Sequence, residues 1–355
     1  MTLGCQWMTK EAMCIFIIAG LLCSVLTANG ETTVAIKPRV QEIPSYAGFS
    51  EIDATRNHFL ILGDTQSTSH WEFWRERNDK ERKLILDEIV KRQPAFVIYL
   101  GDLTVRGGSK KHWQEFDTLH SAWLKEKIPC FPVLGNHEFY GNNKRALDYY
   151  FGRFPYLERK RWYSFVWQGI GVILVDSNFS TLTVEENQQQ RRWYIGELKR
   201  FEGDKKIDFV IVCIHEPPFT NNRVVGPNKR VEVDFANPFL QSIKTSFFFS
   251  GHAHTYERFQ VGDKIFVVSG GGGGPRYKVY SNSNQCRYKD LFSGPELRFF
   301  HACEIMMTDE ALMYSILRLE PDETFKSIDP ISFKRQAKNK GGKDNSIEDG
   351  GIGHL

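Results

Sequence analysis

Apolar runs that end in polar residues recur along most of the chain. In these runs the apolar residues follow one another directly, without the alternation of a half-exposed strand. Uninterrupted runs of this kind are typical of strands that are buried on both faces. The runs are HFLILGD (58–64), FVIYLGD (96–102), CFPVLGNHE (130–138), GVILVDSN (171–178), DFVIVCIHEPP (208–218), SFFFSGHAH (246–254) and KIFVVSGGGGG (264–274).

Segments with a helical pattern lie between some of these runs. In residues 79–93, apolar side chains fall on one face and charged side chains on the other, and residues 112–126 and 187–201 are similar. Residues 296–320 are aromatic-rich and are expected to complete the β layer. Strands that alternate with helices predict an α/β domain. In such domains ligands bind at the carboxyl ends of the strands, so the polar residues that end the runs are expected to meet there.

The two ends of the chain differ from the rest. Lys10 precedes an apolar stretch that runs from Ala12 to about Ala28 and is followed by small residues. This stretch is short for a membrane span, which needs about 20 apolar residues. It favours a signal peptide over residues 1–30, a secreted or periplasmic protein and no transmembrane span in the mature chain. Membrane anchoring by an uncleaved leader or by a lipidated Cys23 is the alternative. Residues 334–355 lack apolar periodicity and are predicted to be disordered.

Composition and charge narrow the range of partners. The chain has 355 residues, of which 41% are hydrophobic, and this is ample for a large core. The formal net charge is +3, and the five basic and three acidic residues from Lys334 onward supply +2 of it. The folded part is therefore close to neutral, and no nucleic-acid surface is expected. Cys286 and Cys303 could pair in an oxidising compartment, but the sequence decides neither this nor the oligomeric state.

The polar residues that end the runs are of the kinds that bind metal ions. The most specific motifs are GNHE at 135–138 and GHAH at 251–254, where two histidines in a turn can aim their rings at neighbouring points. Oxygen and imidazole ligands without thiolates suit iron, zinc, manganese or cobalt. Two cations about 3.5–4 Å apart can clamp an in-line displacement at phosphorus. We therefore predict a dinuclear metal site built from Asp64, Asp102, Asn136, His215, His252 and His254.

Taken in order, these motifs resemble the signature of the calcineurin-like metallophosphoesterase superfamily. That signature is Asp-x-His, Gly-Asp, Gly-Asn-His-Asp/Glu, a single His and Gly-His-x-His, and the resemblance spans about residues 55–275. GNHE, VCIHEPPF at 212–219 and GHAHTYER at 251–258 are most similar to the purple acid phosphatase-like branch. The resemblance implies an α/β fold over residues 50–328, with a β-sandwich flanked by helices in four layers, α/β/β/α.

The resemblance also implies how the site works. The expected ligands of the first ion are Asp64, Asp102 and His254, and those of the second are Asp102, Asn136, His215 and His252. His137 would act at the leaving-group oxygen, while a metal-bound hydroxide would attack phosphorus. The implied activity is the hydrolysis of phosphomonoesters. A phosphodiesterase acting on nucleotide, lipid or wall-polymer substrates, and a catalytically silent binding protein with the same fold, are the alternatives.

Two positions depart from the pattern of the family. Gln66 stands where the superfamily has histidine, and it is expected to be either a weak fourth ligand or part of the pocket wall. Val105 stands where the purple enzymes have the tyrosine whose phenolate binds iron and gives the colour, so no purple colour is expected. His70 lies four residues after Gln66 and would reach the substrate if a helix began there; otherwise it is a polar loop residue.

Further residues near the motifs are candidates for substrate contacts. Glu138 would orient His137 or cap a turn, and Arg223 in the loop after His215 would bind additional phosphate charge. Arg258 would either support the two histidines of GHAH or contact the substrate. The glycines at 270–274 are not followed by the Lys-Ser/Thr of a phosphate-binding P-loop. They form either a flexible turn or a loop that a ligand can approach closely.

Overall fold

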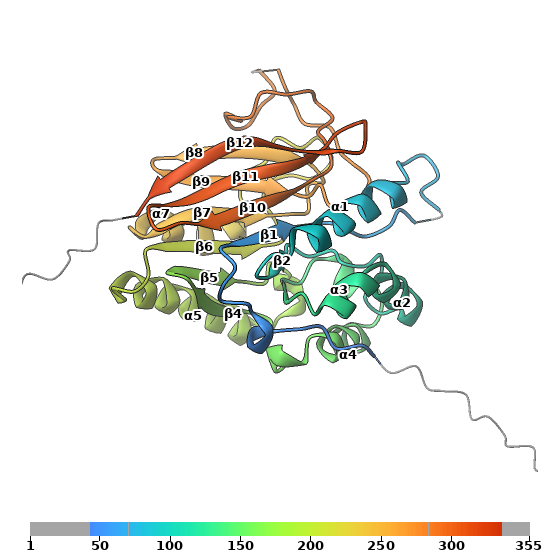
Figure 1. The fold of residues 1–355 in the computed structure, drawn as a ribbon, viewed down its shortest axis with the longest axis horizontal. Coiled ribbons are helices and arrows are strands. Elements are labelled where there is room, and N and C mark those ends of the chain that lie inside the picture. The colour runs from blue at the N-terminus through green and yellow to red at the C-terminus, as the bar shows by residue number, and fades with distance from the viewer. Residues whose placement is uncertain (1–42, 70, 283, 336–355) are drawn as a thin grey trace, which may run out of the picture. The chain divides into compact units, whose positions relative to one another are not determined.

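The computed structural model describes residues 43–69, 71–282 and 284–335, and two six-stranded sheets form its centre (Figure 1). The first sheet has the order β12-β11-β10-β1-β2-β3, and the second has the order β4-β5-β6-β7-β9-β8. The strands of the first sheet are β1 (His58–Leu62), β2 (Val97–Tyr99), β3 (Cys130–Pro132), β10 (His301–Met307), β11 (Ala311–Leu319) and β12 (Phe325–Lys334). Those of the second are β4 (Tyr163–Trp167), β5 (Ile170–Leu174), β6 (Phe209–Ile214), β7 (Thr245–Ser250), β8 (Tyr256–Val261) and β9 (Lys264–Ser269).

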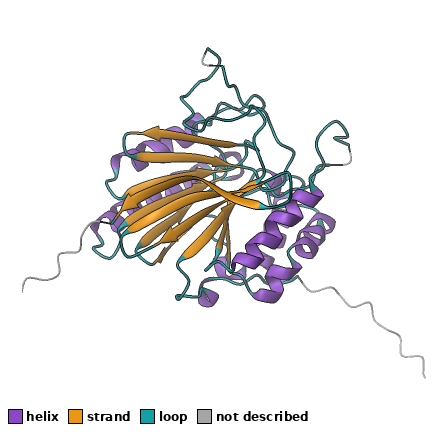
Figure 2. Cartoon of the chain, turned by 45° about the horizontal axis from the view of Figure 1, so that its top comes forward, coloured by secondary structure: helices purple, strands orange, loops and turns teal. Residues whose placement is uncertain are grey.

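Helices connect the strands and lie on either side of them (Figure 2). They are α1 (Asp79–Arg92), α2 (Lys110–Leu119), α3 (Ser121–Glu126), α4 (Asn143–Arg153), α5 (Val184–Gly203), α6 (Lys229–Val231) and α7 (Asn237–Gln241). Short 3₁₀ helices are η1 (Phe49–Glu51), η2 (His137–Phe139), η3 (Pro155–Leu157) and η4 (Phe179–Thr181), and η5 (Glu232–Ala236) is a π-helical turn. The predicted helices at 79–93 and 187–201 are confirmed as α1 and α5.

The single helix predicted over residues 112–126 is wrong, because the chain breaks at His120. The backbone of His120 leaves the helical region with φ −94° and ψ 15°, and α2 and α3 meet there. The His120 ring is fully buried beside Phe116 and Trp123, and it hydrogen-bonds the hydroxyl of Tyr99. The break therefore lets a polar side chain find a partner inside the core.

Parallel strands form one half of the first sheet and the middle of the second. β1, β2 and β3 pair in parallel in the first sheet, as do β5, β6, β7 and β9 in the second. In the first sheet β10, β11 and β12 form the other half with antiparallel pairing, and in the second sheet the antiparallel strands β4 and β8 form the two edges. Because the carboxyl ends of parallel strands meet at one edge, the polar residues that end the runs are carried to the same region.

The core lies between the sheets and beneath the helices. Phe247 of β7 and Tyr314 of β11 bring their ring centroids within 5.1 Å, so side chains of the two sheets pack against each other. Outside the first sheet, α1 buries Ile85 and Ile89, and outside the second, α5 buries side chains such as Phe201. Burial of each such side chain stabilises the fold by about 1.5–3 kcal/mol. The predicted four-layer α/β/β/α arrangement is confirmed.

The fold extends past both expected limits of residues 50 and 328. Tyr46 is buried, and its backbone N–H donates to the Arg153 carbonyl. At the other end β12 runs to Lys334, and Arg335 forms an ion pair with Asp208 at 2.5 Å. Lys334 and Arg335 therefore belong to the fold rather than to the predicted tail.

Several predictions concern parts of the chain outside the described residues. These are the signal peptide at 1–30, the lipidated Cys23, His70 and the tail from residue 336. None of the helices in the described ranges has the length and apolar character needed to cross a bilayer. Cys286 and Cys303 are both free thiols, with Sγ atoms that donate to the Tyr280 carbonyl and the Ser269 hydroxyl respectively.

Candidate metal centre

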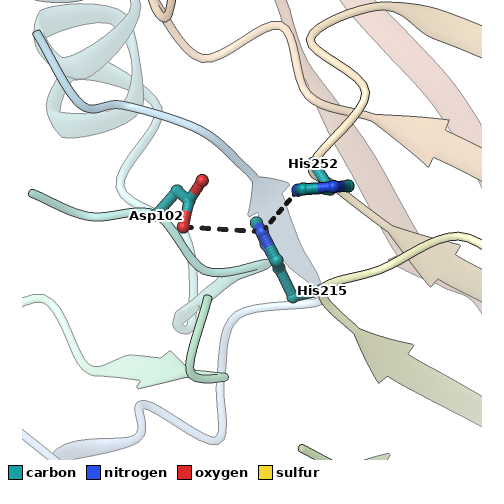
Figure 3. Close-up of side chains that lie close together, drawn as sticks. All are labelled: Asp102, His215 and His252. Carbon is teal, nitrogen blue, oxygen red and sulfur yellow. Dashed lines mark hydrogen bonds and ion pairs between the residues drawn. The ribbon is translucent and has the colours of Figure 1, made fainter. Parts of the chain in front are cut away.

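Two groups of carboxylate and imidazole side chains lie where parallel strands of the two sheets end. Asp64, Asp102 and His254 form one group, and Asp102, His215 and His252 form the other. Within each group the potential ligand atoms lie within 4.8 Å of one another. Asp102 belongs to both groups, so one carboxylate stands between two possible metal positions. Figure 3 shows the second group, with the Asp102 carboxylate and the His252 ring both directed at His215.

Several donor atoms converge on the ring of His215. Its Nε2 atom lies 3.4 Å from Oδ1 of Asp102, 3.0 Å from Oδ1 of Asn136 and 3.2 Å from Nδ1 of His252. In the first group, Nε2 of His254 lies 3.4 Å from Oδ1 of Asp64. The structure thus brings the six predicted ligands together. Cations bound between them could replace the direct contacts between their donor atoms.

A backbone carbonyl fixes the orientation of each of three histidine rings. Nδ1 of His215 lies 2.7 Å from the Leu100 carbonyl oxygen, and Nδ1 of His254 lies 2.8 Å from that of Pro275. Nδ1 of His137 is likewise 2.8 Å from the carbonyl oxygen of Val105. Because a carbonyl can only accept, each Nδ1 carries the proton. This leaves Nε2 of the neutral ring free to bind a cation or exchange a proton.

Four of the clustered residues have left-handed backbone conformations. The φ angles are 60° at Asp64, 54° at Asp102, 66° at His252 and 41° at His254. Conformations of this kind cost on the order of 1–3 kcal/mol each and gather at functional sites. The Asp64 carboxylate offsets part of this cost, because it accepts the His252 backbone N–H at 2.9 Å. The strain is concentrated at the residues that carry the metal-binding groups.

The electrostatic field of the site favours a cation. Burial alone would raise the pKa of Asp102, but the rings of His215 and His137 hold it well below its usual range. Burial would lower the pKa of His215, but the Asp102 carboxylate raises it well above the ordinary value. Burial and the neighbouring His215 lower the pKa of His252 to about 3. Asp102 thus stays ionised, while His252 stays neutral and able to bind a metal ion.

Glu138 binds the backbone of the loops that carry the site residues and does not contact substrate. Its side chain is buried, and its carboxylate accepts backbone N–H groups of Asp102 and Leu103 at 2.9 Å and of Gly135 at 2.8 Å. These bonds join the loop after β2 to the loop after β3. The suggested role of Glu138 as a substrate contact is therefore corrected, because the backbone uses both of its oxygens.

Gln66 lies inside the first group. Its side chain is buried, and its Nε2 atom is 3.3 Å from Oδ2 of Asp102 and 3.0 Å from Nε2 of His254. Its Oε1 atom is buried and has no hydrogen-bond partner among the described residues. A buried acceptor without a partner is costly, so the amide suits a site that a cation completes.

The two arginines suggested as substrate contacts lie elsewhere. Arg223 pairs with Glu296, and its guanidinium lies 5.3 Å from the centroid of the Tyr280 ring. Arg258 donates to the two carboxylate oxygens of Asp329 at 2.8 and 2.9 Å, which joins β8 to β12. Both suggestions are corrected, because carboxylates distant in the sequence hold these side chains.

Two glycines have no side chain that would overlap with the carboxylates of the site. A Cβ atom at Gly135 would lie 2.2 Å from Oδ1 of Asp102, and one at Gly251 would lie 2.6 Å from Oδ2 of Asp64. The glycine run at 270–274 packs against the backbone of the Asp64 turn, where the Gly274 N–H donates to the Asp64 carbonyl at 2.8 Å. The run thus supports the first group of ligands.

A cavity of about 940 Å³ opens over both groups. Asp102, Asn136, His137, His252 and His254 line it, and Val105 is also part of its wall. Its other polar and aromatic lining includes Trp71, Arg75, Arg106, Lys111, Tyr140 and Tyr277, none of which the sequence motifs indicated. The only sequence signal for these residues is their position close to the motifs, as with Tyr140 two residues after GNHE. The cavity has room for a phosphate with a sizeable organic group, beside several cationic side chains.

Comparisons with known proteins agree with this geometry. The family model described as calcineurin-like phosphoesterase matches residues 58–256. Purple acid phosphatase 21 of Arabidopsis thaliana is 26% identical over 212 residues, which are 57% of this chain and 45% of that protein. An uncharacterized Mycobacterium tuberculosis protein is 30% identical over 151 residues, which are 37% of this chain and 28% of that protein. The chain thus spans less than half the length of these relatives.

Solved structures show the same fold at low sequence identity. A purple acid phosphatase from yellow lupin seeds has a TM-score of 0.60 at 18% identity, covering 79% of this chain and 54% of that one. GAP50, the anchor in the inner membrane complex of Plasmodium, has a TM-score of 0.57 at 17% identity, covering 82% of this chain and 92% of that one. The family match covers more than half of the residues. This chain therefore belongs to the calcineurin-like phosphoesterase family.

Proposed function

We propose that this chain hydrolyses phosphomonoesters at a dinuclear metal centre. The observation that carries the proposal is the pair of ligand groups that share Asp102 at the base of a cavity with cationic side chains. Membership of the phosphoesterase family and relatives that are named phosphatases support it. Because the chain spans only part of those relatives, its own activity has to be measured.

The donor atoms present suit two metal ions. Oxygen and imidazole donors without thiolates fit iron, zinc or manganese, and the partnerless Gln66 oxygen fits the same kind of ion. The first ion would be held by Asp64, Asp102, His254 and, more weakly, Gln66, and the second by Asp102, Asn136, His215 and His252. When bound, such a pair of ions stabilises phosphoryl charge and lowers the pKa of a bound water toward about 7.

His137 is placed to handle the leaving-group proton. Its side chain is 25% exposed to the cavity, and its Nε2 atom lies 3.9 Å from Oδ2 of Asp102. The Val105 carbonyl holds the Nδ1 proton, so Nε2 is the atom that gains and releases the mobile proton. With Nε2 protonated, the ring donates to the leaving oxygen, and Asp102 stabilises the charged ring before transfer.

Arg106 is placed to bind substrate charge. It lines the cavity, is exposed, and forms no ion pair with any residue in the described part of the chain. Lys111 lines the same cavity, and its Nζ atom is 3.7 Å from Oε1 of Glu115, where both side chains are largely exposed. These two side chains would attract the phosphoryl group to the ligand cluster and help to orient it.

Hydrolysis of phosphodiesters is the second candidate, because the cavity of about 940 Å³ has room for a second organic group. The test is to load the purified protein with manganese, zinc or iron and compare p-nitrophenyl phosphate with bis-p-nitrophenyl phosphate. We expect the larger kcat/KM for the monoester, and a larger value for the diester would favour the second candidate. No turnover of either substrate with two ions bound would favour the silent binding protein.

We further propose that the leader exports the chain to the periplasm or the medium. The pattern at residues 12–30 supports this proposal. Mass spectrometry of the protein isolated from the producing cells tests it, since cleavage should leave an amino terminus near Ala28 or Gly30. An intact leader, or a lipid on Cys23, would instead indicate membrane anchoring.

A further inference from the structure

Three aromatic side chains project from the segment before α1. Trp71, Phe73 and Trp74 are 87%, 79% and 69% exposed, and we call them the aromatic patch. The rings of Phe73 and Trp74 meet edge to face with centroids 5.1 Å apart. Together they leave several hundred Å² of ring surface in water. An exposed apolar area of this size marks an interaction site.

The aromatic patch adjoins the mouth of the metal-site cavity. Trp71 lines that cavity together with Arg75, Tyr140 and the ligands themselves. Arg75 holds this part of the segment in place, because its guanidinium bonds Glu72 at 2.8 Å and the Tyr277 hydroxyl at 2.5 Å. A molecule bound to the patch would therefore be presented to the ligand cluster.

The charge left free around the patch is positive. The acidic residues of the segment are all paired: Glu72 with Arg75, Glu76 with Arg276 and Asp79 with Arg82. By contrast, Arg77 and Arg106 are exposed and form no ion pair within residues 43–69, 71–282 and 284–335. The patch thus combines projecting rings with cations that are available to an anionic surface.

We propose that the aromatic patch docks onto a lipid–water interface that contains anionic phospholipids. The rings of Phe73 and Trp74 project into solvent and do not line the cavity, and this suits insertion among headgroups better than a clamp around a soluble ligand. Tryptophan favours the headgroup region of a bilayer because its ring is apolar while its N–H group can hydrogen-bond. Free arginines near the surface add attraction to anionic headgroups.

Docking would bring a lipid headgroup phosphoester to the cavity. This second part rests on the proposed function, whereas docking itself needs no catalysis. The substrate class is then an amphiphilic phosphoester whose apolar part stays in the lipid while its headgroup reaches the ligand cluster.

The test compares the full chain with its Phe73→Ser/Trp74→Ser variant. Both residues belong to the patch but do not line the cavity. The matched control is Val184→Ser/Ile243→Ser, which removes two side chains that are 67% and 74% exposed elsewhere. Binding is measured by flotation with vesicles of phosphatidylcholine alone and with phosphatidylglycerol added, and activity is measured on soluble p-nitrophenyl phosphate. Thermal unfolding of each protein verifies that it is folded.

We expect the unchanged chain and the control to bind the anionic vesicles, and the patch variant to bind at least about tenfold more weakly. Turnover of the soluble substrate should be the same in all three. Phe73→Leu/Trp74→Phe should restore most of the binding.

Failure of the unchanged chain to bind, or equal binding by the patch variant, would overturn the proposal. A raised KM for the soluble substrate in the patch variant, without a change in vesicle binding, would also overturn it and indicate ring stacking on substrate. A chain that binds vesicles but hydrolyses nothing would overturn the proposed function and leave docking intact.

Discussion

The Tyr140 hydroxyl accepts a hydrogen bond of 2.8 Å from Nδ2 of Asn136. This bond fixes the side-chain amide so that its Oδ1 atom faces Nε2 of His215 at 3.0 Å. Tyr140→Phe should therefore weaken binding of the second ion by roughly tenfold, because the amide can rotate. Metal titration against a competing chelator would measure the change. Tyr149→Phe, in α4, is the matched control, and equal affinities in the two variants would contradict this role of Tyr140.

Asn136→Ala and His215→Ala test the second ligand group directly. Each should lower occupancy of the second ion, leave the first bound and reduce turnover by at least about a hundredfold. Asp102→Asn should affect both ions, because Asp102 belongs to both groups. Elemental analysis beside kinetics would separate these cases, with His58→Ala on β1 as the control. Full activity in both of the first two variants would show that the ligands are misassigned.

Gln66→His tests whether the first ion uses this position. The end of the Gln66 side chain already lies 3.0 Å from Nε2 of His254, so a ring nitrogen there can reach the same ion. Imidazole is a stronger ligand than an amide oxygen for iron, zinc or manganese, so the first ion should bind about tenfold more tightly with activity retained. Competition with a chelator would measure this, with Gln190→His, in α5, as the control. Unchanged affinity would place Gln66 in the pocket wall.

Gly135→Ala should disrupt the metal centre by steric overlap alone, without removing a ligand. The added Cβ atom would lie 2.2 Å from Oδ1 and 2.3 Å from the backbone nitrogen of Asp102, so the shared ligand has to move. We expect both ions to be lost and the unfolding temperature to fall. Gly196→Ala is the matched control in α5, where a Cβ atom meets nothing within 4 Å. That change should stabilise the protein by about 0.5–1 kcal/mol. Normal metal content in Gly135→Ala would refute the argument.

Glu257 should make the stability of the protein depend on pH. Burial raises its pKa to about 7, although it accepts hydrogen bonds from the Thr220 hydroxyl and the Asn221 N–H. The unfolded chain ionises near the ordinary value of 4.5, so the stability that Glu257 contributes is complete below this pH. It is then lost as the pH rises to about 7.

Glu257→Gln should remove this loss, because glutamine does not ionise. Denaturant unfolding between pH 4 and 8, in the presence of a chelator, would measure the difference between the proteins. The fall in stability specific to the unchanged chain should be about 3 kcal/mol over this range. Glu310→Gln, at an exposed position, should follow the unchanged chain. Parallel curves for all three proteins would show that Glu257 is not responsible.

The predictions from sequence succeeded where one local pattern determines the outcome. The apolar runs are strands because residues such as Ile61 and Ile98 are apolar enough to be buried on both faces of a sheet. The parallel pairing of those strands then brings Asp64 and Asp102 together.

The predictions failed where a partner is distant in the sequence. Arg258 meets Asp329 and Arg223 meets Glu296 only through folding, so neither pairing is visible in a motif. The break at His120 likewise depends on the buried hydroxyl of Tyr99. Aromatic residues such as Trp71 carried no signal, because a projecting ring and a core ring look alike in a sequence.

Each of the two ligand groups draws its residues from both sheets. Asp64 and Asp102 follow β1 and β2, whereas His215 and the two histidines of GHAH follow β6 and β7. An ion bound to either group would therefore act as a cross-link between the halves of the sandwich, and its binding energy would add to the energy that resists unfolding. The lifetime of the molecule among proteases would then follow the supply of metal in its surroundings.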